Sequence, residues 1–510
     1  MLATLRPIVF WVPVGTLAAA VVASVVSFDT LTVVTTLINS WILAHFSQAF
    51  SWGTFLFVLT CVWAFFSPLG RVRIGGAEAV PLLSKWSWFS ITLCTTIAIG
   101  ILFWATAEPI FHLNGPPKGL GVAPGSGEAV QFAMTSLFMH WSFTPYAIYS
   151  VPALAFSLAY YNLGKNYSLS GPLSIVFGPR LKGLGSDIID ALALFALVAG
   201  VAASLGAGMM SIAGGISKVS GLENTPWLQG AVTIAIVSAF VISSITGLQR
   251  GIKFLSDINI KFFFGLCLFV FLTGPSLFIL ETGWQGLVNY SAEFLPRSFG
   301  LGVGDDAQWA RDWTVFYWAN WLAWAPITAL FLGRIARGYT VRQFIAVNFA
   351  LPSLFAMAWM SIFGGAAMHI DLTEAGVLGE ALARSGPESI AYEVLARYPL
   401  ASLLMVVFIF VSFISYVTAA DSNTEAIAGV CQKTPADHNI EAASTGHSTT
   451  VVKIILTTFI GAAAYVMTAF SGIDGVRMMS NLGGLPALIL VLSANVALLL
   501  LGTRYRKELE

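Results

Sequence analysis

Residues 313–326 read Trp313-Thr314-Val315-Phe316-Tyr317-Trp318-Ala319-Asn320-Trp321-Leu322-Ala323-Trp324-Ala325-Pro326. No charged residue occurs between Trp313 and Gly333, and an α-helix needs about 20 such residues to cross a bilayer. Comparable apolar runs recur along the whole chain. Because the runs are continuous rather than alternating, they predict an all-α integral membrane protein instead of a β-barrel.

The composition supports the same fold class. The 510 residues are 57% hydrophobic and 10% charged, whereas about 25% of the residues of a soluble protein are charged. The net charge is zero, so nothing favours nucleic-acid binding. The four cysteines form no CxxC pair and the six histidines form no HExxH motif. We therefore expect no cofactor and no metal centre.

Twelve spans are predicted. The first has a signal-peptide-like Arg6 before its apolar run, but we interpret it as a retained anchor because eleven spans follow it. No linker or soluble domain interrupts the series. The predicted spans are 8–28, 50–69, 86–111, 130–160, 188–214, 228–246, 258–280, 309–333, 345–365, 401–428, 451–470 and 480–501.

The basic residues predict that both termini are cytoplasmic, since cytoplasmic loops carry an excess of Lys and Arg. In this orientation 18 of the 25 basic residues lie on the inner side. The other seven lie outside: Lys118, Lys218, Arg297, Arg311, Arg384, Arg397 and Arg477. Acidic residues instead cluster in the outer stretches 281–312 and 371–393, where Tyr290–Arg297 and Glu388–Arg397 are typical of short amphipathic helices.

Aromatic residues gather on one face of each of two spans. In the fourth span, Trp141, Tyr146 and Tyr149 fall within an arc of about 140°, and Pro145 removes a backbone hydrogen bond in mid-span. In the eighth span the shared face carries Trp313, Tyr317, Trp318, Trp321 and Trp324. An interfacial aromatic belt accounts for Trp313 but not for the deeper tryptophans. Core packing and a binding site both remain open.

A binding site of this kind would hold a cation by cation–π attraction, which contributes about 2 kcal/mol or more when desolvated. It suits a quaternary ammonium, which cannot donate hydrogen bonds. No carboxylate lies on either aromatic face.

The third and tenth spans also depart from plain apolar sequence. The centre of the third span is small and hydroxyl-rich, which favours either close helix packing or a broken helix whose carbonyls face a substrate or ion. The tenth span ends in Tyr416-Val417-Thr418-Ala419-Ala420-Asp421-Ser422. An intramembrane carboxylate such as Asp421 is a functional candidate, although a structural hydrogen-bonding role is equally compatible.

In these residues the sequence resembles the betaine/choline/carnitine transporter family over nearly the whole chain. The family hallmark W-T-x-F-Y-W-x-W-W matches Trp313–Trp321 and continues into Trp324-Ala325-Pro326 and Phe331–Gly338. Further matches are Glu108-Pro109, His140-Trp141, Ala147-Ile148-Tyr149 and Ala420-Asp421-Ser422. Each dipeptide is a weak signal, but their order and spacing across more than 300 residues are specific.

The resemblance implies a five-plus-five inverted repeat formed by spans 3–7 and 8–12, with two extra spans in front. The corresponding domains are 1–85, 86–280, an outer amphipathic helix over 281–308, and 309–510. It also implies a homotrimer in the lipid of a bacterial inner membrane. The implied substrate site comprises Trp141, Tyr146, Tyr149, Trp318, Trp321 and Trp324, with Gly100 and Asn320 beside them.

The departures from the family pattern bear on specificity and on coupling. Asn320 replaces a hallmark tryptophan, and Tyr146 stands where many members have tryptophan. The glycine-rich segment of the third span is here Thr96-Ile97-Ala98-Ile99-Gly100. The implied sodium site keeps Thr418, but Ala419 replaces a hydroxyl residue. Sodium is therefore the expected coupling ion, with Thr418 as ligand and with Ala98 and Asp421 in the supporting segments.

Lys261 provides the alternative to sodium. In sodium-independent members a fixed cation from the seventh span replaces the ion, and Lys261 opens this span. It would equally reach the cytoplasmic interface and pair with Asp257.

We expect a secondary transporter that imports a quaternary-amine or betaine-type solute, either as a symporter or as a sodium-independent exchanger. A channel would need a filter of carbonyls or charges, and a membrane enzyme would need a nucleophile–base pair or a metal set. We find neither pattern in the sequence, so no enzymatic activity is expected.

Overall fold

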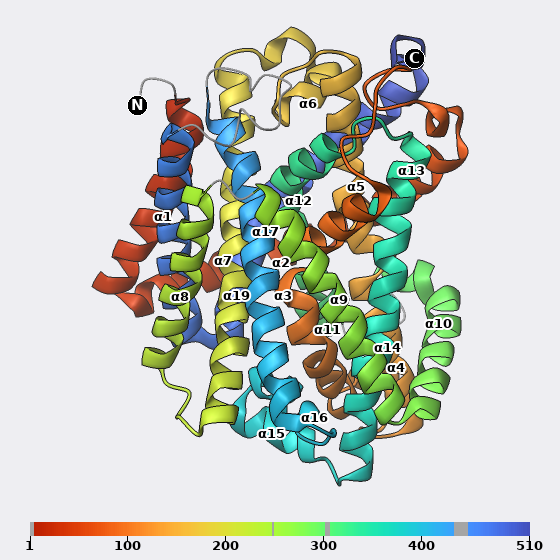
Figure 1. Cartoon of the computed structure of the whole chain (residues 1–510), viewed down its shortest axis with the longest axis vertical. Coiled ribbons are helices and arrows are strands. Elements are labelled where there is room, and N and C mark those ends of the chain that lie inside the picture. Colours follow the sequence, from red (N-terminus) through yellow and green to blue (C-terminus); the bar gives the residue numbers. More distant parts are fainter. Residues whose placement is uncertain (1–4, 247–248, 301–306, 433–446, 510) are drawn as a thin grey trace.

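The computed structural model describes residues 5–246, 249–300, 307–432 and 447–509, and every regular element in these ranges is helical (Figure 1). The α-helices are α1 (Pro7–Val26), α2 (Phe28–Phe66), α3 (Lys85–Asn114), α4 (Gly127–Trp141), α5 (Phe143–Ser157), α6 (Ser170–Phe177), α7 (Leu184–Ser220), α8 (Pro226–Thr246), α9 (Gln249–Thr273), α10 (Ser276–Ser298), α11 (Ala307–Ala310), α12 (Phe316–Ile335), α13 (Val341–Ile345), α14 (Leu351–Thr373), α15 (Val377–Ser385), α16 (Ile390–Leu395), α17 (Ala401–Cys431), α19 (His447–Thr503) and α20 (Arg506–Leu509).

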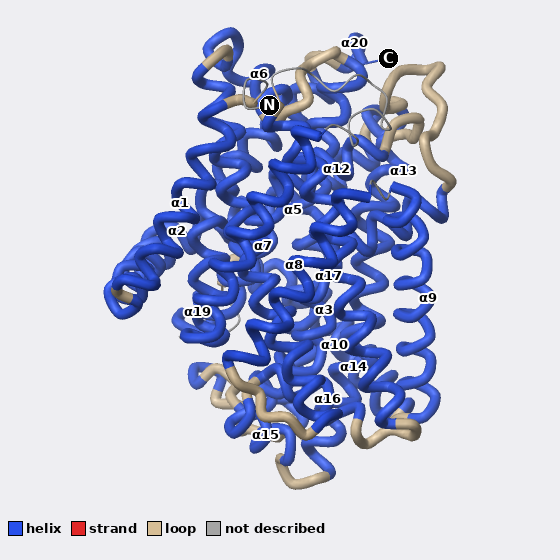
Figure 2. The backbone as a smooth tube through the Cα atoms, turned by 60° about the vertical axis from the view of Figure 1, so that its left-hand side comes forward, coloured by secondary structure: helices blue, strands red, loops and turns tan. Residues whose placement is uncertain are grey.

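The helices are long and apolar enough for a multi-pass membrane protein. Nine helical segments of the described residues could cross a membrane, and the bent helix α3 makes a tenth if its two halves form one span. Figure 2 shows that the loops gather at the two ends of the bundle. The prediction of an all-helical integral membrane protein is confirmed, whereas twelve spans and an inverted repeat stay predictions.

Helix α12 lies at the centre of the bundle. Of its most apolar window, within Ala307–Ile335, 94% is buried, compared with 33% for α1 and for Phe254–Thr273 of α9. It packs against α5, α7 and α19, while α3 packs against α4, α14 and α17. A π-helical turn, Arg311–Val315, leads directly into α12, and such turns are frequent at functional sites.

The fourth predicted span is two helices rather than one. The chain leaves helical geometry at Ser142 (φ −113°, ψ −119°), so that α4 ends at Trp141 and α5 begins at Phe143. Pro145 therefore lies in the first turn of α5 instead of in mid-span. Backbone N–H groups in the first turn of a helix have no helical partner, so the N–H that proline lacks is not needed there. This break places Trp141 at a helix end.

Other boundaries also differ from the predicted ones. Helix α9 stops at Thr273, and Gly274-Pro275 separates it from α10, which begins at Ser276. The segment predicted as an outer amphipathic helix is therefore a helix of 23 residues that starts before residue 281. Helix α2 is 39 residues long and begins at Phe28, well before the predicted span 50–69. Helix α19 contains two spans that meet at Gly472, whose φ of +56° suits glycine.

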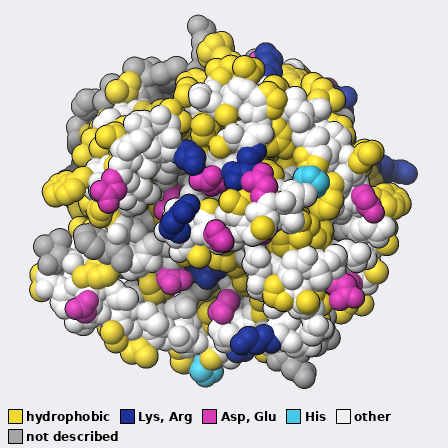
Figure 3. Space-filling model, turned by 90° about the horizontal axis from the view of Figure 1, so that it is seen from below, with side chains coloured by type: hydrophobic (Ala, Val, Ile, Leu, Met, Phe, Trp, Pro, Cys, Tyr) yellow, Lys and Arg dark blue, Asp and Glu magenta, His cyan; other side chains and the backbone are white. Residues whose placement is uncertain are grey.

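The two ends of the bundle differ in their polar contacts. Leu5 pairs with Gln432, and Asn162 donates to the carbonyls of Arg73 and Leu509, so these segments share one end. Helices α15 and α16 lie at the other end, which Figure 3 views directly. Acidic and basic side chains gather near the middle of that face. Glu393 of α16 pairs with Lys218.

Candidate functional site

Four of the predicted aromatic residues converge on the centre of α12. The ring centroid of Trp321 lies 5.4 Å from that of Trp141, 5.9 Å from that of Tyr146 and 5.5 Å from that of Tyr149. All four side chains are buried. We call these four residues the aromatic box. The break between α4 and α5 and the packing of both helices on α12 thus bring together predicted site residues from two distant segments of the chain.

The two indoles of the aromatic box are fixed by hydrogen bonds. Trp321 Nε1 donates to the backbone carbonyl of His140 at 3.1 Å, which ties α12 to the end of α4. Gly100 of α3 lets the Trp141 ring approach, since a Cβ built on Gly100 would lie 3.1 Å from Trp141 Cη2. Helix α3 is bent by 52° between Ile97 and Gly100.

Three other predicted site residues on α12 point elsewhere. Trp324 Nε1 donates to Ser204 Oγ of α7 at 3.0 Å. Asn320 Oδ1 accepts from Ser480 Oγ of α19 at 3.0 Å. Trp318 is fully buried, and its ring contacts His140 at 6.2 Å between centroids. Neither Trp318 nor Trp324 therefore has a ring contact with the aromatic box, and the amide oxygen of Asn320 is bonded to α19 instead.

A buried carboxylate lies directly behind the aromatic box. Glu108 of α3 is fully buried, and its Oε2 accepts hydrogen bonds from Trp141 Nε1 at 2.8 Å and from Tyr317 OH at 2.6 Å. Its Oε1 lies 2.6 Å from His140 Nδ1 and 3.3 Å from His112 Nε2. The carboxylate thus links the third, fourth and eighth predicted spans.

Glu108 was quoted above only as part of the Glu108-Pro109 match, and its place at the site was not predicted. No acidic residue occurs on the two aromatic faces, and Glu108 comes from a third helix. The available signal was the i, i+4 spacing of Glu108 and His112, which places both on one helix face. Together with His140, their nitrogen and oxygen atoms all lie within 4.8 Å of one another. Because Oε2 already accepts the N–H of Trp141 and the O–H of Tyr317, we interpret the group as a hydrogen-bond network rather than a metal centre.

The predicted sodium site is only partly described. Thr418 Oγ1 donates to the carbonyls of Ile414 and Ser415 within α17, at 2.9 and 3.1 Å. Ala419 is fully buried, and its carbonyl accepts from Asn423 Nδ2 at 2.8 Å. The side chains of Ala98 and Asp421 lie outside the described part of the structure. Helix α3 packs on α17, as a sodium site between them requires.

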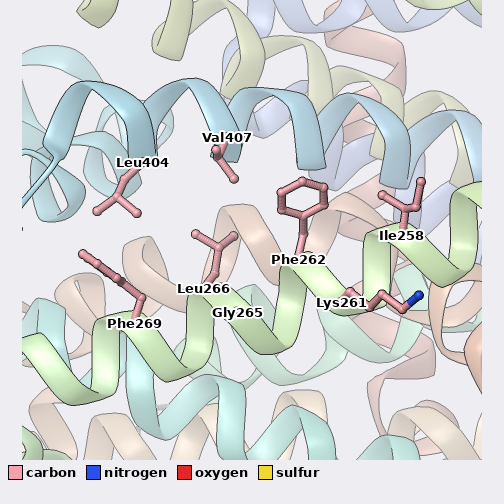
Figure 4. Close-up of a pocket in the computed structure, with 8 residues that line it drawn as sticks. All are labelled: Ile258, Lys261, Phe262, Gly265, Leu266, Phe269, Leu404 and Val407. Carbon is pink, nitrogen blue, oxygen red and sulfur yellow. The ribbon is translucent and has the colours of Figure 1, made fainter.

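Lys261 lies on the outside of the bundle. Its side chain is 66% exposed, and its ammonium pairs with Asp257 at 2.6 Å. It stands at one end of an apolar groove of about 570 Å³ between α9 and α17 (Figure 4). This placement matches the interfacial alternative for Lys261 and offers no buried fixed charge.

The chain is a multi-pass helical membrane protein with a cluster of aromatic side chains in its interior. Comparison with known proteins identifies its family. The model of the BCCT, betaine/carnitine/choline family transporter, matches residues 8–505. The chain therefore belongs to this family, as the sequence resemblance indicated, and it is a transporter rather than an enzyme.

Curated relatives are similar over most of their length. Glycine betaine transporter 1 of Vibrio parahaemolyticus is 34% identical over 421 residues, covering 82% of this chain and 79% of its own. The ectoine/hydroxyectoine transporter of Virgibacillus pantothenticus is 30% identical over 448 residues, with 88% and 87% covered. The osmo-independent choline transporter BetT1 of Acinetobacter baylyi is 29% identical over 398 residues, with 77% and 75% covered.

Proposed function

We propose that the protein is a secondary transporter that imports a small quaternary-amine or betaine-type solute by alternating access. The candidate solutes are glycine betaine, choline, carnitine, trimethylamine N-oxide and sulfonium analogues. The observation that carries the proposal is the aromatic box, in which Trp321 is surrounded by Trp141, Tyr146 and Tyr149. Buried aromatic faces attract a methylated cation that needs no hydrogen-bond acceptor.

The names of the relatives support compact charged solutes. They include glycine betaine, choline and ectoine. All three fit a small site that combines aromatic faces with a few polar groups.

Sodium-driven symport is the proposed coupling. Thr418 on α17 would supply a hydroxyl oxygen, and carbonyls of the bent third span would supply the rest, because sodium is a hard cation that prefers oxygen ligands. The packing of α3 on α17 supports this arrangement. A sodium-independent exchanger of the same fold is the alternative, and the exposed ion pair of Lys261 with Asp257 does not favour it.

The proposed setting is the inner membrane of a bacterium, with both termini inside. Twelve spans would form the five-plus-five repeat behind two extra spans, and three copies would form a homotrimer. The excess of Lys and Arg at the proposed inner side supports the orientation. Protease accessibility of both termini in sealed inside-out vesicles would test it.

Uptake of radiolabelled choline and glycine betaine into proteoliposomes tests the transport proposal. We expect saturable uptake that unlabelled quaternary amines compete away, whereas unsaturable flux would indicate a channel. An imposed inward sodium gradient should accelerate uptake relative to potassium buffer, and Thr418→Ala should reduce this acceleration. If uptake ignores sodium and is stimulated only by preloaded solute, the exchanger is correct. Lys261→Ala, which changes only an exposed ion pair, serves as the control and should behave like the wild type.

A further inference from the structure

The network behind the aromatic box places four hydrogen-bonding side chains around one carboxylate. Trp141 Nε1–H can only donate, and Tyr317 OH donates to the same oxygen of Glu108. The other oxygen lies beside ring nitrogens of His140 and His112. Because an N–H and an O–H group converge on one oxygen of Glu108, the arrangement favours an ionised carboxylate.

The two histidines differ in their hydrogen-bond partners. His112 directs Nε2 at Glu108, while its buried Nδ1 has no partner among the described residues. A proton on that nitrogen would be a buried donor without an acceptor, so His112 is held neutral. His140 directs Nδ1 at Glu108 and lies 3.0 Å from Thr314 Oγ1 through Nε2. The Thr314 hydroxyl can donate to Nε2 or accept from it, so His140 can gain a proton without leaving a donor unpaired.

Two arginines also pack near the network. Arg297 of α10 pairs with Glu293 at 2.6 Å and donates to Ser136. Arg477 of α19 lies over the ring of Trp313 and 3.8 Å from Asp474. Tyr317 is engaged by Glu108 itself. His140 is thus the group that decides whether the charge of Glu108 is neutralised.

Both indoles of the aromatic box are attached to this pair. The N–H of Trp141 points at the Glu108 carboxylate, and the N–H of Trp321 points at the backbone carbonyl of His140. A hydrogen bond to a carboxylate makes an indole ring more electron-rich, and the charge itself lies in a buried, low-dielectric region. A cation in the aromatic box would therefore experience Glu108 directly.

We propose that Glu108 and His140 form a proton-binding site whose occupation opposes the binding of a net-cationic substrate in the aromatic box. With His140 neutral, the negative charge of Glu108 stabilises the substrate's ammonium. With His140 protonated, the pair is neutral and the attraction is lost. By linkage, substrate binding also expels the proton. The effect is larger for choline, which is a net cation, than for glycine betaine, which carries its own carboxylate. The inference rests on the proposed quaternary-amine function.

The test is calorimetric titration of the purified protein in lipid nanodiscs with choline and with glycine betaine, between about pH 5 and pH 8, where histidine changes charge. The choline Kd should fall as pH rises, by at most about tenfold per pH unit for one competing proton. His140→Asn keeps an N–H near the position of Nδ1 and removes the titrating nitrogen. It should bind choline with a pH-independent Kd. His112→Gln is the matched control and should keep the pH dependence.

Two further variants separate the possible outcomes. Glu108→Gln should weaken choline more than glycine betaine and abolish the pH dependence. The inference is overturned if choline affinity in the wild type is independent of pH, or if the dependence survives in His140→Asn. If Trp321→Ala binds choline as tightly as the wild type, the proposed function itself fails. If Trp321→Ala loses binding while the pH dependence is absent from the wild type, only the inference fails.

Discussion

A single methyl group added at Gly100 should weaken substrate binding. The new Cβ of Gly100→Ala would lie 3.1 Å from Trp141 Cη2 and 3.4 Å from Cζ3, whereas carbon atoms prefer about 3.5–4.0 Å. The ring must then move by several tenths of an ångström. It cannot do so freely, because its N–H is bonded to Glu108 at 2.8 Å and its centroid lies 5.4 Å from that of Trp321.

The expected size follows from the contacts that the ring must give up. Losing part of one cation–π contact costs about 0.5–1 kcal/mol, which raises the substrate Kd roughly two- to fivefold. The fold should tolerate the change, because overpacking costs about 1–3 kcal/mol while alanine gains about 1 kcal/mol over glycine in a helix.

Gly265→Ala is the matched control for this prediction. Gly265 lies within α9 and has no neighbour within 4 Å of a built Cβ. Calorimetric titration with choline and with glycine betaine should show a weaker Kd for Gly100→Ala and an unchanged Kd for Gly265→Ala. Equal affinities for the two variants would refute the reasoning, since Trp141 would then not line the substrate site.

Two further predictions concern stability. Arg6 bonds the buried Asp190 at 2.6 Å, so Arg6→Ala should cost on the order of 3 kcal/mol of stability by leaving that charge unpaired. The apparent Tm should therefore drop, and it should drop less in the double variant Arg6→Ala/Asp190→Asn. An equal or larger drop in the double variant would contradict this. Burial raises the pKa of Glu388, beside α16, from 4.5 to about 7. The folded state therefore holds this proton more tightly than the unfolded state, and stability falls as pH rises from about 4.5 to 7. The apparent Tm of Glu388→Gln should gain on the wild type over that window, and a constant difference would count against it.

The fold class could be predicted because membrane insertion imposes a local signal. Apolar runs such as Trp313–Gly333 need no partner to be recognised as spans. The positions of the helix ends within the bundle were predicted less accurately. Ser142, where α4 gives way to α5, has no turn signature of its own, and the sequence placed Pro145 in the middle of one continuous span. The geometry there depends on packing between helices rather than on local preference.

The candidate site divides in the same way. The sequence placed Trp141, Tyr146 and Tyr149 on one face of a single helix, and the family resemblance grouped them with Trp321. In the structure Trp141 ends α4 while Tyr146 and Tyr149 lie on α5, yet all three rings lie beside Trp321. Trp318 and Trp324 belong to the same stretch of α12, yet Trp318 lies beside His140 of α4 and Trp324 bonds Ser204 of α7. Helical periodicity fixes which residues share a face, but not which neighbour that face meets.

Glu108 was missed for a related reason. Its contacts reach over 32 residues to His140 and 209 residues to Tyr317. No single segment of sequence contains the network, so only the packed helices reveal it. Pairings over such separations depend on the tertiary fold, which local sequence patterns do not specify.

We interpret the aromatic box as a site that binds a quaternary ammonium through its charge. The most direct measurement compares choline with its neutral carbon isostere, 3,3-dimethylbutan-1-ol, by calorimetric titration of the wild type, Trp321→Ala and Trp359→Phe. Trp359 is a buried tryptophan that stacks on Phe363, away from the aromatic box. The wild type and Trp359→Phe should bind choline far more tightly than the isostere. Trp321→Ala should lose about 2 kcal/mol, roughly 30-fold in Kd, for choline. Equal binding of choline and its isostere, or an unchanged choline Kd in Trp321→Ala, would contradict this interpretation of the aromatic box.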